Sequence, residues 1–516
     1  MMALPGQAAD VLRPVQACGD RMDASRLVNA IFTGESVNRD YPDVFEVKFL
    51  MATTRSVLVI FGFVIAALPV FAQDGTAPAV TFNKDVAPIF YQHCVVCHHP
   101  NDIAPMSLVT YKEARPWAAA IREAVVRRVM PPWHADPHVG DFLNDPRLSD
   151  KDIQTIDAWA KSGATEGDPK DLPAAPSFHD GWHIKPDVVL TIPEQVVKAG
   201  NQDDYEYIYV PTHFTEDKWI QAAEVLPGDR RVVHHATVSV VSADEAPKLI
   251  ESHAGVQKQD KYHFRTGKVN HMKADAPVAD DGCSASADGQ LPDPTSGGIN
   301  HVPAIYLPGH LAEVRPPGYA LKIPAGSYLQ FQVHYSNRLG KDVTDRTSIG
   351  LVFSKEPVTH EVAQYEIWNN WFQIPPNDGD HKVTSCFTLP KDVMVVAYTA
   401  HMHFRGKSMT TEAIYPDGRH EVLYNVPKYD FRWQETYFLR HQFLMPKGTK
   451  LVTTAYFDNS ANNGLNPDPS KTIRWGEPST EEMMGFWLAY ADVTPVDEKA
   501  VGSAKAGMGG ELSAKK

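Results

Sequence analysis

The second half of the chain alternates apolar and polar residues in short runs separated by prolines and glycines, and this pattern restricts the fold most. It begins near Asp187, in a chain with 40 prolines and 33 glycines. A period of two places apolar side chains on one face of a strand, and closely spaced turns favour antiparallel sheets. The clearest predicted strands cover residues 188–192, 205–210, 232–241, 328–335, 393–399 and 450–457. We therefore predict a multidomain protein with two tandem antiparallel β-sandwiches of jelly-roll-like form, over residues 185–345 and 346–495.

A pattern typical of a covalent haem site lies nearer the N-terminus. Cys94 and Cys97 are separated by two valines, and His98 follows directly. In a Cys-x-x-Cys-His pentapeptide both thiols attach to haem c and the histidine ligates its iron. A zinc site would need four ligands, and the sequence has no second Cys-x-x-Cys pair. We therefore predict a small all-α, cytochrome c-like domain over residues 80–170, followed by a linker over residues 171–184.

A low-spin haem also needs a ligand on its opposite face, and methionine there raises the reduction potential. Met106 is close behind His98, which leaves little chain to reach the other face. Met130 follows a predicted helix over residues 111–128 and precedes a rigid Pro-Pro-Trp turn. We predict Met130 as the sixth ligand, with Met106 as the alternative.

The last predicted helix of this domain has clear signals at both ends. Ser149 and Asp152 form a Ser-x-x-Asp capping pattern, and apolar residues follow at helical spacing. Gly163 lies where a C-terminal cap belongs.

Residues 51–72 have the form of a secretory signal peptide, with a basic start, an apolar stretch and a small-residue cleavage site. The apolar stretch, residues 57–70, is shorter than the ~20 residues of a membrane-spanning helix. We therefore predict a periplasmic or secreted protein, with no stable membrane insertion after cleavage. We predict that Met51 is the true start, and that residues 1–50 are included because an upstream start codon was chosen in error. A genuine cytoplasmic extension would instead make the apolar stretch an anchor.

Two cysteines remain between the haem motif and the C-terminus, Cys283 and Cys386. An oxidising compartment would allow them to form a disulfide. The formal net charge of −14 argues against a nucleic-acid partner, which requires a basic surface. The tail over residues 496–516 is predicted to be disordered.

Histidines with the spacing of metal ligands lie on the predicted strands. His334 is on the polar face of its strand, directed toward solvent or a neighbouring site. His401 and His403 would share one face of a strand and form a two-point clamp for a metal ion. His234 and His235 would point in opposite directions on a regular strand. They can bind one metal ion only if the strand twists or bulges, with the ring nitrogens nearest the backbone as donors.

Four motifs in this half together resemble the copper type II, ascorbate-dependent monooxygenases, which include peptidylglycine α-hydroxylating monooxygenase and dopamine β-monooxygenase. They are Val-Val-His-His-Ala-Thr at 232–237, Phe-Gln-Val-His-Tyr at 331–335, Ala-His-Met-His at 400–403 and Ser-Thr-Glu-Glu-Met at 479–483. They occur in the family order, and the similarity covers most of residues 185–495. The resemblance implies two β-sandwich domains, with one copper ion on each, facing across a solvent-filled cleft.

Carried over by motif, the resemblance gives each copper ion three ligands. The electron-transfer copper ion takes three histidines: His234, His235 and His334. The oxygen-binding copper ion takes the catalytic set of two histidines and one methionine: His401, His403 and Met483. Met484 is the shifted alternative for the methionine. A thioether favours Cu(I), the state that meets O₂. The chain departs from the family in having few cysteines for disulfides and in carrying a haem motif.

These features predict an exported haem- and copper-dependent monooxygenase that hydroxylates a small organic or peptide-like substrate with O₂. Electrons would enter through the haem from a cytochrome, a quinol-linked chain or a small reductant, and reach the electron-transfer copper ion. One alternative is a haem and copper protein for electron transfer or copper handling, without oxygenase activity. Another is a binding module in which the haem domain contacts redox partners.

Overall fold

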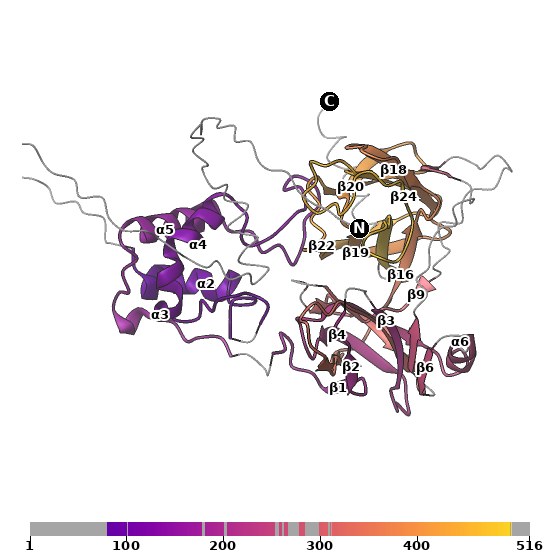
Figure 1. Cartoon of the computed structure of the whole chain (residues 1–516), viewed down its shortest axis with the longest axis horizontal. Helices are drawn as coiled ribbons and strands as arrows, with labels where there is room; N and C mark the ends of the chain where they lie inside the picture. The colour runs from indigo at the N-terminus through magenta and orange to yellow at the C-terminus, as the bar shows by residue number, and fades with distance from the viewer. Residues whose placement is uncertain are drawn as a thin grey trace, which may run out of the picture. The chain divides into compact units, whose positions relative to one another are not determined.

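The computed structural model describes residues 80–100, 102–177, 181–200, 204–252, 257–260, 263–266, 278–283, 299–307, 310, 312–495 and 497. The predicted signal peptide, the residues before it and the expected disordered tail other than Asp497 lie outside the described residues. The described part is mostly β-sheet with few helices, as the sequence predicts (Figure 1). No described helix combines the length and apolarity needed to cross a bilayer.

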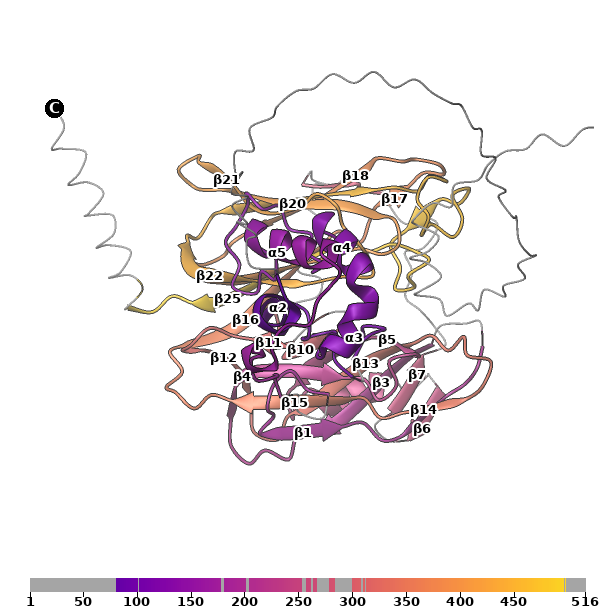
Figure 2. The same cartoon turned by 90° about the vertical axis from the view of Figure 1, so that its left-hand side faces the viewer.

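Helices are concentrated between residues 82 and 171, where they lie together (Figure 2). They enclose one apolar core that contains several aromatic side chains. The segments are η1 (Phe82–Val86), α2 (Ala87–His93), α3 (Tyr111–Ala114), η2 (Arg115–Trp117), α4 (Ala118–Val126), α5 (Asp150–Lys161) and η3 (Pro169–Asp171). Phe82, Phe90 and Trp159 are fully buried in this core, with the Phe90 ring centroid 6.2 Å from that of Trp159. The identity of this region as a cytochrome c domain remains a prediction.

Local signals in the sequence explain where these helices begin and end. The single helix predicted over residues 111–128 is divided into α3, η2 and α4, because Pro116 has no backbone N–H to continue regular α-helical bonding. The capping box of Ser149 and Asp152 at the start of α5 is confirmed. Gly163, just beyond the end of α5, has a φ of +98°, a conformation that favours glycine.

The first sandwich has two facing sheets. One contains β1 (Val188–Thr191), β15 (Ser348–Phe353), β4 (Lys218–Leu226), β12 (Tyr319–Ile323) and β11 (Glu313–Val314). The other has the order β10 (Ala304–Tyr306), β5 (Val233–Val241), β13 (Tyr328–Tyr335), β3 (Asp204–Pro211), β7 (His263–Thr266) and β6 (Gln257–Asp260). Apolar residues of both sheets, such as Phe331 and Leu351, form one core. A small pair, β2 (Gln195–Val197) with β14 (Val343–Asp345), and helix α6 (Ala246–Ser252) complete this half.

The second sandwich follows the same principle. One sheet contains β16 (His360–Trp368), β25 (Gly485–Asp492), β19 (Val393–His401) and β22 (Thr436–Met445). The other has the order β21 (His420–Val426), β20 (Gly406–Ile414), β23 (Lys450–Phe457), β18 (His381–Thr388) and β8 (Asp281–Gly282). The pair β17 (Gln373–Ile374) and β24 (Ile473–Arg474) lies outside both sheets. Residues such as Val395 and Leu451 fill the core between the sheets.

The two sandwiches are joined at several points. Strand β12 pairs in parallel with β16, which makes one sheet continuous between them. Two short strands that precede β10, β8 and β9 (Ile299–Asn300), pair with β18 and β16 of the second sandwich. The predicted Cys283–Cys386 disulfide is confirmed, with a Cα–Cα distance of 4.9 Å. Strand β15 lies beyond residue 345, the predicted end of the first sandwich, yet it pairs with β1 and β4.

A segment between α4 and α5, here called the strap (residues 133–144), contacts the second sandwich. The backbone N–H of Leu143 donates to the Phe438 carbonyl at 2.7 Å. The Asn144 side chain donates to the Thr436 carbonyl at 2.7 Å and accepts from the Phe438 N–H at 3.1 Å. The strap therefore lies along β22 much as an additional strand would.

Candidate metal centres

Three histidines of the first sandwich converge on one point. His234 and His235 lie on β5, and His334 lies on the neighbouring strand β13. The Nδ1 atom of His235 is 3.3 Å from Nδ1 of His234 and 3.3 Å from Nδ1 of His334. One ring nitrogen from each residue lies within 4.8 Å of the other two. Nitrogens bound at about 2.0 Å to a tetrahedral metal ion lie about 3.3 Å apart, so the donor set fits a shared ion.

A β-bulge brings His234 and His235 together. His235 is opposite His334, while the next residue of β13, Tyr335, is opposite Val233. His234 is therefore the extra residue of the bulge, which bends the strand and redirects its side chain. The predicted bulge and the convergence of the nitrogens nearest the backbone are both confirmed.

Burial keeps His235 neutral and keeps His334 away from solvent. The His334 side chain is 1% exposed and its ring stacks on Tyr205 at 4.2 Å, so it faces a neighbouring site and not solvent. The pKa of His235 is well below its usual value, chiefly because of burial and then because of the other histidines. A neutral imidazole is the form that binds a metal ion.

A second pair of histidines lies where β19 ends. His401 is the last residue of the strand, and the ring centroids of His401 and His403 are 5.1 Å apart. The Nδ1 atom of His401 is 2.7 Å from the Gln434 side-chain oxygen, which leaves Nε2 as the ligand atom. Burial lowers the pKa of His401 to about 4 and that of His403 well below its usual value. The Nδ1 atom of His403 is buried and has no hydrogen-bond partner in the described structure.

The sequence predicts that the His401 and His403 rings share one face of a regular strand. In the structure they do not, because the strand ends at His401. The backbone leaves the β-ladder after His401 because other groups take its N–H donors. The Met402 N–H donates to the Tyr429 hydroxyl at 3.0 Å, and the His403 N–H donates to the Glu482 carboxylate at 2.8 Å. The pair is therefore formed at a turn held by side chains from elsewhere in the fold.

Glu482 connects this turn to the predicted methionine ligand. Its carboxylate accepts from the backbone N–H groups of His403, Arg405 at 2.6 Å and Met483 at 3.2 Å. Burial raises the pKa of Glu482 to about 8. The N–H donors and Arg405 act in the opposite direction and favour the ionised form, which accepts hydrogen bonds at both oxygens.

The surroundings of the two adjacent methionines distinguish them. Met484 is fully buried in the hydrophobic core of the second sandwich. Met483 is partly exposed, and its backbone is held by the same carboxylate that holds His403. Met483 is therefore the better candidate for a ligand.

One loop, here called the bridging loop (residues 429–434), contacts both groups of histidines. The Phe431 ring stacks on His234, with centroids 5.4 Å apart and planes 22° apart. The same ring meets His403 at 5.9 Å and 88°. The resemblance implied a solvent-filled cleft between the two sites. In the structure a side chain that is only 7% exposed contacts both of them.

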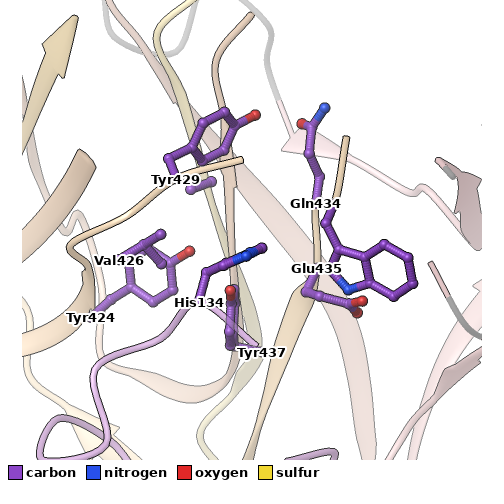
Figure 3. A pocket seen from close by; sticks show the side chains of 9 residues that line it. His134, Tyr424, Val426, Tyr429, Gln434, Glu435 and Tyr437 are labelled. Atoms are coloured by element: carbon purple, nitrogen blue, oxygen red, sulfur yellow. The ribbon is translucent and has the colours of Figure 1, made fainter. Parts of the chain in front are cut away.

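Figure 3 shows the side chains that line a small pocket. Its lining is mostly polar and aromatic: His134, Ala400, Tyr424, Val426, Tyr429, Trp433, Gln434, Glu435 and Tyr437. His134 comes from the strap, whereas the other residues belong to the second sandwich. Burial raises the pKa of Glu435 to about 7. Ala400 and Gln434 place this pocket directly against His401.

The Cys-x-x-Cys-His segment follows α2 and has free thiols at Cys94 and Cys97. The His98 Nδ1 atom is 3.1 Å from the Met106 carbonyl oxygen, so that Nε2 is left for a metal. This tautomer and ring orientation suit an iron ligand. Met130 is partly buried just beyond α4, and Met106 packs against the helical core. The choice between the two methionines stays a prediction.

Four charged residues, here called the clamp (Asp102, His183, Glu224 and Arg230), join this segment to the first sandwich. The His183 Nε2 atom is 2.7 Å from the Val96 carbonyl oxygen and 3.2 Å from Asp102, and Nδ1 contacts Glu224 of β4. Arg230 pairs with the other oxygen of Asp102 at 3.2 Å. Burial would lower the pKa of His183, but hydrogen bonds to Asp102 and Glu224 raise it to about 10.

Sequence reasoning did not identify the residues that support the metal-ligand candidates. Glu482 had one available signal, its position between two predicted ligands within the Ser-Thr-Glu-Glu-Met motif. Gln434, Phe431 and Tyr429 had none, because they are ordinary residues of a loop far from the ligands in sequence. Their positions depend on how β21 and β22 are paired.

The comparisons with known proteins agree with one half of this site. Residues 367–504 match the family model of the copper type II ascorbate-dependent monooxygenase C-terminal domain. The matched range includes His401, His403 and Met483. The match supports a copper monooxygenase, and therefore an oxidoreductase, at the level of the family.

Solved structures with a similar arrangement are only distantly alike. PNGF-II has 10% sequence identity and a TM-score of 0.22 over 67% of this chain and 72% of its own. The major capsid protein P2 from bacteriophage PM2 has 7% identity and a TM-score of 0.22, over 60% and 97% of the two chains. The VP2 subviral particle of infectious bursal disease virus has 7% identity and a TM-score of 0.15, over 62% and 80%. Likenesses of this size carry no argument about function.

Proposed function

We propose that this protein is an exported, haem- and copper-dependent monooxygenase that hydroxylates an organic substrate with O₂. The observation that carries the proposal is the convergence of three histidine Nδ1 atoms on β5 and β13. It occurs in a chain whose residues 367–504 match the C-terminal domain of copper monooxygenases. The chain thus offers, outside the matched range, a second group of candidate metal ligands, as the resemblance implies.

The two groups of ligands have different chemical character. The first would hold copper through three imidazoles, a donor set that suits both oxidation states. The second would hold copper through His401, His403 and the Met483 thioether, which favours Cu(I). When bound, copper supplies one-electron redox chemistry and a place for O₂ to react. Gln434 fixes the orientation of the His401 ring, and Glu482 fixes the turn that carries His403.

Electrons would enter at the Cys94–His98 segment. Cys94 and Cys97 would attach haem c, and His98 with Met130 would ligate its iron. The clamp supports this route, because Asp102 and the carbonyl of Val96 are bonded to side chains of the linker and the first sandwich. Arg230, which holds Asp102, lies four residues before His234. The external donor would be a cytochrome, a quinol-linked chain or a small reductant.

Two observations support a periplasmic or secreted location. The Cys283–Cys386 disulfide is of a kind that forms and persists mainly in oxidising compartments. Residues 51–72 have the composition of a signal peptide.

The first test is the metal content of the mature protein, measured by elemental analysis against a haem assay after copper loading and desalting. We expect about two copper ions per haem. His235→Ala and Met483→Ala should each lower the copper retained, and Met483→Ala should abolish hydroxylation while haem reduction continues. The control is His420→Ala, which changes an exposed histidine paired with Glu412. Haem without retained copper would contradict the proposal and leave an electron-transfer or binding protein.

A further inference from the structure

The bridging loop is hydrogen-bonded to the second histidine pair and its turn. The Tyr429 hydroxyl donates to the Met402 carbonyl at 2.6 Å and accepts from the Met402 N–H. The Gln434 side-chain oxygen contacts His401, and its Nε2 donates to the Phe431 carbonyl at 3.0 Å. These bonds hold the loop on the second pair, and Phe431 reaches the first group from it.

The position of the Phe431 ring is well determined by its neighbours. Phe404 packs its ring against Phe431 at 4.8 Å and 80°, on the side of the second pair. On the other side, the Phe431 ring stacks face to face on the His234 ring. The planes of the Phe431 and His403 rings are nearly perpendicular. A ring that is 7% exposed and has three aromatic neighbours has little freedom to turn.

We propose that Phe431 is the positioning residue that couples the two metal centres, holding the first group of histidines against the second and carrying electron exchange between them. This inference rests on the proposed function. It departs from electron transfer across an open, solvent-filled cleft, because one side chain contacts a ligand candidate of each centre. The contact also sets the distance between the centres.

The step assigned to this contact is one electron. With both centres loaded with copper and O₂ absent, one electron would pass from Cu(I) held by the first group to Cu(II) held by the second. No proton moves and no bond to Phe431 forms or breaks. The electrons come from a small chemical reductant added at two per protein, one for the haem and one for copper.

The test uses the full mature protein, loaded with copper and freed of excess metal. Pulsed dipolar EPR of the fully oxidised protein measures the separation of the two Cu(II) ions. Rapid freezing after addition of the reductant measures the rate of exchange between the two copper EPR signals. We expect Phe431→Leu to slow this exchange several-fold and to broaden or lengthen the Cu(II)–Cu(II) distance distribution. Phe431→Tyr, which keeps the ring, should restore both.

Phe438→Leu is the matched control. Phe438 lies on β22 and has the same 7% exposure as Phe431, but it packs in a separate apolar cluster. It should leave both measurements at the values of the unchanged protein. Equal exchange rates and distances in Phe431→Leu and the unchanged protein, with both copper ions retained, would overturn the inference and leave the proposed function intact. An unchanged protein that retains no copper would overturn the proposed function as well.

Discussion

At the scale of single residues, the second histidine pair is positioned by hydrogen bonds to its backbone. Glu482 accepts three N–H donors from two stretches of chain that are far apart in sequence. Gln434 holds one ring nitrogen of His401, which leaves the other free for a metal. Each contact selects one geometry for a ligand candidate, and such supporting contacts strongly affect metal affinity.

Glu482→Gln should weaken the second centre and lower stability. Both carboxylate oxygens accept from backbone N–H groups, whereas glutamine would place an NH₂ group against one of these donors. Leaving a buried donor without an acceptor costs about 1–3 kcal/mol. We expect a lower midpoint of thermal unfolding and less copper retained. Glu481→Gln, in the adjacent position, should change neither quantity. A Glu482→Gln variant with the same unfolding midpoint and the same retained copper as the unchanged protein would refute the positioning role.

At the scale of elements, irregularities in strands create the sites. The bulge in β5 brings His234 beside His235. Strand β19 ends at His401, and the turn that carries His403 begins there. The strap adds hydrogen bonds along β22, the strand that follows the bridging loop. The strap therefore supports the loop that contacts both centres.

Asn144→Ala should loosen the strap from β22. The change removes the acceptor for the Phe438 N–H and the donor to the Thr436 carbonyl. At about 1–3 kcal/mol for an unsatisfied group, the Phe438 amide should exchange its hydrogen about tenfold or more faster. Hydrogen exchange measured by NMR or mass spectrometry checks this. The exposed Asn462→Ala is the control, and unchanged protection of Phe438 would show that the strap bond is dispensable.

At the scale of the whole molecule, the clamp joins the Cys-x-x-Cys-His segment to the first sandwich. His183 has oxygen acceptors at both ring nitrogens, a geometry that requires the charged imidazolium. Burial would raise the pKa of Asp102, but the hydrogen bond from His183 and the charge of Arg230 lower it. The link is thus a buried group of compensating charges.

The clamp should make stability depend on pH in a defined window. The pKa of His183 is about 10 in the folded protein, compared with about 6.5 for a free histidine. Its contribution is complete below about pH 6.5 and declines as the pH rises through about 10. We expect the midpoint of thermal unfolding to fall between these values more steeply than in His183→Gln. Parallel pH profiles for the two proteins would exclude the imidazolium as the source.

The sequence by itself determined the features that depend on neighbouring residues. The strands on which His234 and His334 lie, the cap of α5 at Ser149 and the need for a bulge at His234–His235 are all confirmed. These follow from periodicity, capping chemistry and the alternation of side chains along a strand. They act over a few residues, and the sequence displays them directly.

Only the tertiary structure decided how the ligand candidates are supported and how the two groups meet. Phe431 contacts both groups, and Glu482 holds the His403 turn, although neither belongs to the strands that carry the histidines. Which of the two adjacent methionines enters the core, Met484, is also a tertiary outcome. These outcomes depend on the pairing and packing of segments far apart in the chain, where many combinations suit the same local pattern.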